Sequence, residues 1–335
     1  MITVSVIIPC YKSSKTLPIV VENIKKAILA REGYDYQIIL VNDYPYDETF
    51  GAIRELCRDE KVIGVNLSKN FGQTAAKMAG LKYFSGDVLV YMDDDGQHPA
   101  DQIYLLVDKV LEGYDMVYAY FPHKKHSLFK RFTSYLNNKL SELKGTKVKN
   151  VHVSSYHALS KFAAAKLKKY KSPFPSIGGY LHVIIKTCVD VELEHRERIS
   201  GESNYTLRKL FALWLTTFTN FSLVPLRFAS IIGFGCSVVG FLFGLFVVLR
   251  KIINPSIAAG YTSSIALQLF IGGIIMLILG LIGEYIGRIY MTISDLPQYV
   301  VREELNSEKL DIEELSTSSN RQFNNSTDKE VQRKD

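Results

Sequence analysis

Apolar and polar stretches alternate regularly from the first residues of the chain to Tyr120. Several of the apolar stretches are short, continuous and rich in β-branched residues, as strands buried on both faces are. These predicted strands lie at 4–9, 36–43, 62–67, 87–93 and 115–120. The stretches between them have apolar residues at helical spacing and predict helices at 17–30, 48–57, 74–84 and 100–111. Strands that alternate with helices through short connections predict an α/β fold, in which helices cover both faces of a mostly parallel sheet.

Polar residues follow the predicted strands at the point where each strand ends. The polar groups in question are Pro9-Cys10-Tyr11, Asn42-Asp43, Ser68-Lys69-Asn70 and Asp93-Asp94-Asp95. Ligands of open α/β sheets bind beyond the carboxyl ends of the strands, so we expect these groups to meet in one cleft. No GxGxxG motif opens the first helix and no GxxxxGK[ST] motif occurs, which argues against a dinucleotide dehydrogenase and a P-loop ATPase.

The three adjacent aspartates repel one another unless positive charge lies among them. In an extended stretch Asp93 and Asp95 point the same way, and Asp94 points elsewhere. With the amide oxygen of Gln97 nearby, these two carboxylates predict a site for Mg²⁺ or Mn²⁺ with positions left for phosphate oxygens. The alternative is a solvated acidic turn, but the place at a buried strand's end favours the metal site.

Two charge-free stretches near the C-terminus, 228–249 and 252–283, are each long enough to cross a membrane as a helix. They predict a two-helix transmembrane hairpin that turns near Asn254-Pro255; two buried helices of a soluble domain are the alternative. After the second stretch, Glu284 can pair with Arg288 one helical turn later. Amphipathic stretches at 126–143 and 206–221 carry basic residues beside Phe, Leu and Trp, and predict interfacial helices rather than helices packed on the sheet.

The net charge, the cysteine spacing and the N-terminal sequence indicate where in the cell the protein lies. The net charge of +6 suits a protein that lies against an anionic leaflet, and the absence of a basic stripe interleaved with aromatics argues against nucleic-acid binding. The four cysteines have no CxxC spacing, which suits a reducing compartment. The N-terminus has no signal-peptide pattern, so we expect a cytoplasmic catalytic domain on a multi-pass protein of the plasma (inner) membrane. The expected divisions are a catalytic domain at 1–205, an interfacial helix at 206–227, the hairpin at 228–290 and a cytoplasmic tail at 291–335 that is disordered after Glu303.

The motifs in this order resemble the membrane-anchored family 2 glycosyltransferases, in particular the polyprenyl-phosphate group related to dolichol-phosphate mannose synthase. The resemblance rests on the strand-end Pro9 and Asn42-Asp43, on LSKNFGQTAAKMAGL (67–81), MDDDGQHP (92–99), RERISGESNY (196–205) and LIGEYIGRIY (281–290). It implies a GT-A (Rossmann-like) nucleotide-sugar-binding domain and the transfer of a sugar to a polyprenyl phosphate such as undecaprenyl phosphate. The donor it implies is UDP-linked, with a guanosine nucleotide as the next choice. It also makes a homo-oligomer such as a tetramer unsurprising.

Carried over by position, the resemblance assigns roles to individual residues. Asp93, Asp95 and Gln97 match the DxD segment and would hold the metal. The donor would be bound by Pro9, Tyr11, Asp43, Lys69, Asn70, Gly72 and Asp94. The catalytic groups that meet the phosphates of donor and acceptor would be Asp95, Arg131, Arg198 and Ser203.

The chain departs from the family pattern in three places. Lys12-Ser13 replaces an Asn-Glu pair, and Tyr44-Pro45 replaces Gly-Ser after Asp43. Many relatives have an acidic residue, a proposed general base, where this chain has Ser155. A phosphate monoester, whose second pKa is about 6, needs no such base at neutral pH, so the substitution favours a phosphate acceptor. The alternatives are a base supplied by His152 or His157, transfer to a hydroxyl of a lipid-linked glycan or glycolipid, and a catalytically inactive membrane scaffold.

Overall fold

The computed structural model describes residues 1–122, 151–173, 175–194, 224–254, 261–294 and 296–307. The predicted interfacial helices at 126–143 and 206–221 lie outside the described residues. The chain divides into two compact units, one made of Met1–Asn204 and Pro297–Asp335 and the other of Tyr205–Leu296. Each unit is treated below by itself.

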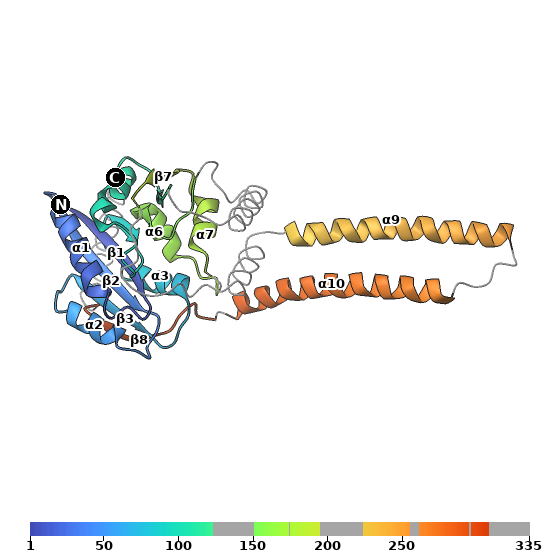
Figure 1. Cartoon of the computed structure of the whole chain (residues 1–335), viewed down its shortest axis with the longest axis horizontal. Helices are drawn as coiled ribbons and strands as arrows, with labels where there is room; N and C mark the ends of the chain where they lie inside the picture. The colour runs from blue at the N-terminus through green and yellow to red at the C-terminus, as the bar shows by residue number, and fades with distance from the viewer. Residues whose placement is uncertain (123–150, 174, 195–223, 255–260, 295, 308–335) are drawn as a thin grey trace, which may run out of the picture. The chain divides into compact units, whose positions relative to one another are not determined.

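The first unit is built on a mixed sheet, whose strands in the described residues follow the order β7-β5-β6-β4-β1-β2-β3-β8 (Figure 1). The strands are β1 (Ile2–Cys10), β2 (Tyr34–Asn42), β3 (Val62–Leu67), β4 (Val88–Tyr91), β5 (Met116–Tyr120), β6 (His157–Ser160), β7 (Cys188–Glu192) and β8 (Val301–Leu305). Neighbours among β1 to β4 pair in parallel, as do β5 and β7, while β6 runs antiparallel to both β4 and β5. The five predicted strands are confirmed, and the carboxyl ends of β1 to β5 and β7 share one edge of the sheet.

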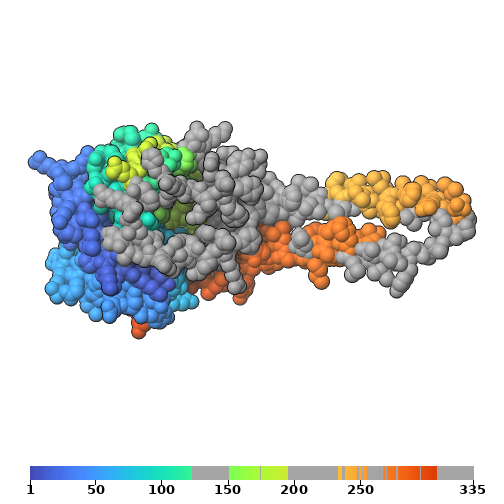
Figure 2. Space-filling view, in the orientation of Figure 1, coloured from blue at the N-terminus to red at the C-terminus, as the bar shows by residue number. Residues whose placement is uncertain are grey.

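Helices cover both faces of this sheet, as predicted. The helices of the first unit are α1 (Leu17–Leu29), α2 (Thr49–Leu56), α3 (Gln73–Leu81), the 3-10 turn η1 (Ala100–Gln102), α4 (Ile103–Leu111), α6 (Lys161–Lys168) and α7 (Ile177–Ile184). One buried apolar cluster joins the sheet to α1, α2 and α4, and a second joins it to α3, α6 and α7. In the space-filling view the blue and light-blue atoms of this unit pack against one another (Figure 2).

The alternation of side chains along β1 explains why a continuous apolar run is needed. Val6 and Ile8 enter the first cluster and Ile7 the second, and all three are fully buried. Burying an aliphatic side chain of this size contributes about 1.5–3 kcal/mol, so both faces of the strand add to stability. Gly80 of α3 lies so close to β1 that an added Cβ would come within 2.6 Å of Ile7, and glycine therefore permits this contact.

The chain returns to the sheet after the second unit, which the sequence did not predict. The expectation of a structureless tail from Glu303 is wrong for the described residues, because β8 pairs antiparallel with β3 as far as Leu305. Polar side chains hold this edge strand in place: Arg54 pairs with Glu303 at 2.8 Å, and Asn306 Nδ2 donates to the carbonyl of Cys57 at 2.7 Å. Its polar composition suits an edge strand that has one neighbour.

The second unit contains two long helices, α9 (Val224–Ile253) and α10 (Tyr261–Ile293). They contact each other within the unit. At one contact, a Cβ added to Gly233 would lie 3.6 Å from Cδ1 of Ile278. Among the described residues one stretch, Phe270–Ile293 of α10, is long and apolar enough to cross a membrane. The predicted pair between Glu284 and Arg288 is present at 2.6 Å.

Candidate active site

The strand ends of β1, β2 and β4 are tied together at the carboxyl edge of the sheet. Asp43, the residue after β2, donates its backbone N–H to the carbonyl of Cys10 at the end of β1, at 2.9 Å. The backbone N–H of Met92, just after β4, donates to the carbonyl of Ile7 at 3.1 Å. The predicted meeting of polar strand ends is therefore present, and the loops that follow them share this edge.

The Asp43 carboxylate holds the loop that leads into α3. Its oxygens accept hydrogen bonds from the backbone N–H groups of Phe71, at 2.7 Å, and Gly72, at 2.9 Å. Burial raises the pKa of Asp43 to about 6, although the two amide hydrogen bonds lower it. Gly72 has φ +90°, a backbone conformation that favours glycine, and it caps the N-terminus of α3. Asp43 thus positions Gly72, and the neighbouring Lys69 and Asn70 belong to the same loop.

Asp94 holds the loop after β1 in a similar way. Its carboxylate accepts a hydrogen bond from the backbone N–H of Tyr11 at 2.8 Å. Burial raises the pKa of Asp94 to about 6, hydrogen bonds from Ser13 and Tyr11 lower it, and the charges of Asp93 and Asp95 raise it further. Asp94 therefore points away from the partners of Asp93, as predicted from the sequence.

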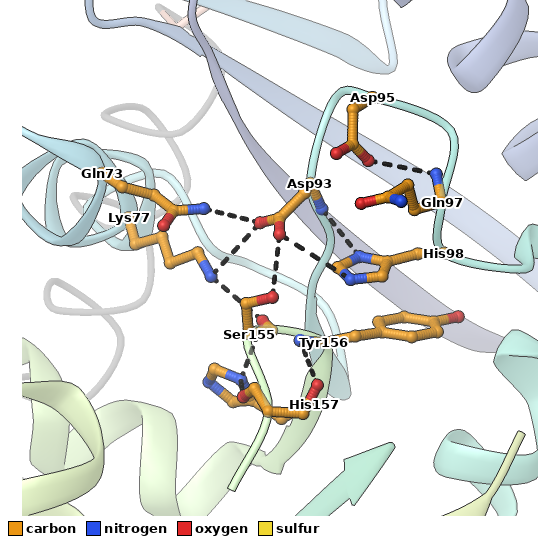
Figure 3. Close-up of polar contacts among 10 residues, drawn as sticks. Gln73, Lys77, Asp93, Asp95, Gln97, His98, Ser155, Tyr156 and His157 are labelled. Atoms are coloured by element: carbon orange, nitrogen blue, oxygen red, sulfur yellow. Dashed lines mark hydrogen bonds and ion pairs between the residues drawn. The ribbon is translucent and has the colours of Figure 1, made fainter. Parts of the chain in front are cut away.

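Asp93 lies at the centre of a polar cluster that draws on three elements (Figure 3). Its carboxylate accepts hydrogen bonds from Gln73 Nε2 at 2.7 Å and from Ser155 Oγ at 2.8 Å. Lys77 Nζ and His98 Nε2 each lie 3.7 Å from a carboxylate oxygen. Burial alone would raise the pKa of Asp93, but the charges of Lys77 and His98 and the Ser155 hydrogen bond outweigh burial, so its pKa lies below the ordinary value.

Lys77 supplies the positive charge that the adjacent aspartates require. It is 5% exposed, and its ammonium also donates to the carbonyl of Ser155 at 3.0 Å. Burial lowers the pKa of Lys77, and the neighbouring Asp93 opposes that shift. Helix α3 brings Lys77 and Gln73 to this place, one turn apart on the same face. Helical spacing places Lys77 in a predicted helix, but its burial against Asp93 could not be seen from the sequence.

The segment after Asp93 is a turn, which corrects the extended geometry expected for Asp93–Asp95. Strand β4 ends at Tyr91, and Asp94 and Asp95 lie in a turn that Gly96 continues at φ +75°. Asp95 Oδ1 accepts from the backbone N–H of Gln97 at 3.0 Å, a local bond that favours a turn over a strand. The three carboxylates consequently have three different sets of partners, which separates their charges.

The donor atoms of this turn match a hard divalent cation in part. Carboxylate and amide oxygens from Asp95 and Gln97 are ligands that Mg²⁺ and Mn²⁺ accept. Asp93 is already engaged by Gln73, Ser155 and two basic side chains. In the part of the chain that the structure describes, no group of three or more His, Cys, Asp or Glu side chains is placed to hold a metal ion by itself. Asp95 and Gln97 thus provide oxygen donors that suit a divalent cation, but the described residues do not make a complete metal site.

Ser155 and His157 do not have the surroundings of a general base. The Ser155 hydroxyl donates its proton to Asp93. His157 is 5% exposed between Tyr91 and Tyr118, and its Nδ1 lies 3.1 Å from the carbonyls of both Ser154 and Ser155. Burial lowers the pKa of His157 to about 3, and the charge of Lys77 lowers it too. The imidazole of His157 has a structural place in the core.

An aromatic group that the sequence analysis did not identify lies beside the β1 and β2 loops. Tyr11 and Tyr44 pack edge to face at 5.1 Å, and Tyr44 and Tyr46 do so at 5.5 Å. Lys12 Nζ lies 4.7 Å from the centre of the Tyr44 ring, within cation–π range. Tyr46 is 70% exposed, so this group offers an open aromatic surface. Two of the three departures from the family pattern, at Lys12 and Tyr44, therefore contact each other.

The structure brings together part of the predicted set. Pro9, Tyr11, Asp43, Lys69, Asn70, Gly72, Asp93, Asp94, Asp95 and Gln97 all lie at the carboxyl ends of β1 to β4 or in the loops that follow. Arg131, Arg198 and Ser203 lie outside the described residues.

Comparisons with known proteins agree with this arrangement. Residues 5–168 match the model of the family described as Glycosyl transferase family 2. An "Uncharacterized glycosyltransferase YkcC" of Bacillus subtilis is 32% identical over 302 residues, which cover 89% of this chain and 93% of the relative. The chain belongs to glycosyltransferase family 2. It is thus a family 2 glycosyltransferase, and its GT-A-like mixed α/β sheet is the fold implied by the sequence motifs.

Other relatives of this glycosyltransferase carry more specific names. An "Undecaprenyl-phosphate 4-deoxy-4-formamido-L-arabinose transferase" of Aeromonas hydrophila is 31% identical over 310 residues, covering 90% of this chain and 93% of the relative. Its namesake from Shewanella sediminis is 31% identical over 307 residues, covering 90% and 92%. Among solved structures, glucosyl-3-phosphoglycerate synthase from Mycobacterium tuberculosis matches with TM-score 0.46 and 20% identity, over 66% of this chain and 80% of that one.

Proposed function

We propose that this glycosyltransferase moves a sugar from a nucleotide-sugar, UDP-linked, to a polyprenyl phosphate at the cytoplasmic face of the plasma membrane, for the synthesis or modification of a cell-surface glycan. The single observation that carries the choice of acceptor is the hydrogen bond from Ser155 to Asp93. Many relatives have an acidic residue at the position of Ser155. In this chain the position instead holds a hydroxyl group that donates a hydrogen bond. The names of the undecaprenyl-phosphate transferases support the same class of acceptor.

The donor is assigned to the loops after β1, β2 and β3. Tyr11 offers an aromatic ring for the nucleobase, beside the exposed Tyr46 and in contact with Tyr44. Asp43 and Asp94 hold these loops through backbone N–H groups, and Pro9 precedes the β1 loop. We assign Lys69 and Asn70 of the β3 loop, together with Gly72, to contacts with the donor's phosphates.

A divalent cation, Mg²⁺ or Mn²⁺, is assigned to the turn after β4, where Asp95 and Gln97 supply oxygen ligands. A cation held by these residues would supply positive charge to stabilise the departing nucleoside diphosphate. Asp93 belongs to the same site, and Lys77 and Gln73 hold its carboxylate in place. By resemblance Arg131, Arg198 and Ser203 contact the phosphates of donor and acceptor.

The reaction needs the acceptor oxygen in line with the bond that breaks. A phosphate monoester is mostly dianionic at neutral pH, since its second pKa is about 6, so its oxygen attacks the sugar's C1 without losing a proton to the protein. The C1–oxygen bond to the nucleoside diphosphate breaks as the new C1–oxygen bond forms. Displacement in one step inverts the configuration at C1.

The acceptor's lipid tail accounts for the second unit. Large apolar side chains of α9 and α10 are exposed in the protein alone, among them Phe241 at 72% and Met276 at 73%. Large apolar side chains exposed to this extent are typical of contact with lipid or with another apolar helix. We assign α9 and α10 to a transmembrane hairpin, and the basic stretches at 126–143 and 206–221 to the membrane surface. Small residues along α10 would also permit helix packing in a homo-oligomer such as a tetramer.

The experiment uses purified full-length protein in detergent with Mn²⁺, a panel of radiolabelled nucleotide-sugars and undecaprenyl phosphate. We expect label from one donor to enter the organic phase, and EDTA to abolish the transfer. Transfer to a glycolipid hydroxyl, with none to undecaprenyl phosphate, would overturn the proposed acceptor. Binding of a nucleotide-sugar with transfer to no acceptor would favour the inactive scaffold.

A further inference from the structure

One exposed histidine lies a short distance along the chain from Ser155 and is held in a fixed orientation. The backbone N–H of His152 donates to Asp190 Oδ2 at 3.0 Å, and the ring nitrogen Nδ1 lies 2.6 Å from the same oxygen. The ring also stacks on Tyr120, with centroids 4.0 Å apart and planes 22° apart. Two hydrogen bonds and a ring contact thus fix both the main chain and the imidazole.

The contact with Asp190 determines which nitrogen of His152 remains for a ligand. An ionised carboxylate only accepts hydrogen bonds, so Nδ1 carries the proton that it shares with Asp190. The other nitrogen, Nε2, is left to meet a substrate. The His152 side chain is 60% exposed, whereas that of Asp190 is 21% exposed. A half-buried carboxylate therefore orients an accessible imidazole, the arrangement that fixes a histidine for binding or proton transfer.

The sheet topology places His152 on the side of β4 away from the proposed nucleotide loops. Tyr120 is the last residue of β5, and Asp190 lies in β7, which pairs in parallel with β5. In the strand order, β1 flanks β4 on one side, and β6, β5 and β7 follow on the other. The donor loops follow β1, β2 and β3, so an acceptor that attacks opposite the leaving diphosphate approaches over β6, β5 and β7. His152 stands at that part of the carboxyl edge.

The stretch from His152 to Ser155 connects this position to the reaction centre. It is anchored at one end by Asp190 and at the other by the Ser155–Asp93 hydrogen bond. Between the anchors Val153 is 63% exposed, so the stretch presents one imidazole and one apolar side chain together. A prenyl phosphate joins a charged phosphate to an apolar chain and matches that pairing.

We infer that His152, oriented by Asp190, binds the phosphate of the lipid acceptor through Nε2. The inference rests on the proposed function and adds a specific acceptor residue to it. Nε2 and one phosphate oxygen share one hydrogen bond, and another oxygen of the dianionic phosphate is left to form the bond to C1. The C1–oxygen bond to the nucleoside diphosphate breaks as the new bond forms, so no proton moves to the protein.

Steady-state kinetics on the full-length protein test this role. The variants are His152→Ala, His152→Gln and Asp190→Asn, with Glu192→Gln as the matched control because it removes an exposed carboxylate from the same strand. A hydrogen bond to a charged group predicts that His152→Ala raises the KM for undecaprenyl phosphate about ten- to hundredfold and leaves the donor KM unchanged. His152→Gln, whose amide can still donate to phosphate, should recover part of the loss, and Asp190→Asn should lose less than His152→Ala. An unchanged acceptor KM in His152→Ala, or an equal rise in both KM values, would overturn the inference.

A binding measurement separates this inference from the proposed reaction. Full-length protein with ¹⁵N-labelled histidine is titrated with phenyl phosphate, a soluble phosphate monoester, and imidazole resonances are recorded. We expect one resonance to move in the wild type and to be missing in His152→Ala. If that resonance moves but the wild type transfers no sugar to undecaprenyl phosphate, the proposed reaction fails and the phosphate site stands. If the same resonances move in His152→Ala, the inference is wrong even where transfer occurs.

Discussion

The two sides of the carboxyl edge use their carboxylates differently. Over β1 and β2, Asp43 and Asp94 accept hydrogen bonds from backbone N–H groups and so hold loops in shape. From β4 toward β7, Asp93 and Asp190 contact side chains that can carry charge, namely Lys77, His98 and His152. The first side therefore consists of loops that carboxylates hold in a fixed shape, and the second of basic side chains that carboxylates hold at defined positions.

This difference fits the proposed function, in which each side binds a different substrate. A nucleotide presents a base and phosphates of constant shape, which fixed loops and backbone groups can match. In that proposal the other side holds the attacking phosphate next to a departing diphosphate, and both are anionic. In that proposal Lys77, held beside Asp93, reduces part of that repulsion without rearranging during the reaction.

The largest expected effect comes from removing the charge of the turn after β4. Asp95→Asn should lower the transfer rate by about 10²–10³-fold, because the proposed cation, which would stabilise the leaving diphosphate, loses a carboxylate ligand. The rate is measured by radiolabel transfer in detergent with Mn²⁺. Asp87→Asn is the matched control, since Asp87 precedes the other end of the same strand and accepts from Thr3 N; it should keep its rate. Equal losses in both variants would show that Asp95 acts through stability.

Lys77→Met tests whether the charged cluster around Asp93 also holds the fold. Removing one partner of a buried ion pair leaves an unpaired charge, so we expect the free energy of unfolding to fall by about 3 kcal/mol. Lys82→Met on the same helical segment is the control, because the exposed pair of Lys82 with Glu304 should contribute less than about 1 kcal/mol. Denaturant titration measures both, and equal losses would mean that burial of Lys77 is not what matters.

Asp43→Asn tests how Asp43 holds its loop, through the pH dependence of the unfolding free energy. The pKa of Asp43 is about 6 in the folded protein, above its ordinary value of 3.8, so the folded state keeps a proton that the unfolded state has released. The wild type should therefore lose about 2–3 kcal/mol of unfolding free energy relative to the variant as pH rises from 4 to 6, and none above that. Unfolding midpoints of both proteins across that range measure it. If the unfolding free energy of the wild type stayed constant or rose relative to that of the variant between pH 4 and 6, the assignment would be contradicted.

The smallest expected effect is that of Ser155→Ala. The variant loses one hydrogen bond to Asp93, so we expect a transfer rate within about fivefold of the wild type. If Ser155 were instead needed as a base or as the acceptor's main contact, the rate would fall far more. The same radiolabel assay distinguishes these outcomes.

The five strands up to Tyr120 and the helices between them could be predicted from the sequence, because each of them has its own apolar spacing. Strands β6 and β7 and helices α6 and α7 were not predicted. The parallel strands and the helices between them follow directly from that periodicity. Strand β8 could not be predicted, since Val301–Leu305 alternates with charged residues and is stabilised by contacts with β3 far away in the sequence.

The site residues could be predicted where a sequence motif marks them, but not where two contacting residues lie far apart in the sequence. Strand ends identified Asp43 and Asp93 to Asp95, and the local bond of Asp95 to Gln97 turned an expected extended stretch into a turn. The pairs of Lys77 with Asp93 and of His152 with Asp190 join residues 16 and 38 positions apart, as the numbering shows. No local pattern indicates such pairs, because tertiary packing decides them.

The most direct test of the central claim is the identity of the atom that receives the sugar. Full-length protein is incubated with Mn²⁺, the accepted nucleotide-sugar and undecaprenyl phosphate, and the lipid product is examined by ³¹P NMR. The account predicts that the monoester resonance of the lipid phosphate is replaced by a phosphodiester resonance, with inverted configuration at the sugar's C1. A labelled lipid product whose phosphate is still a monoester, or transfer that proceeds equally well to a lipid alcohol, would contradict it.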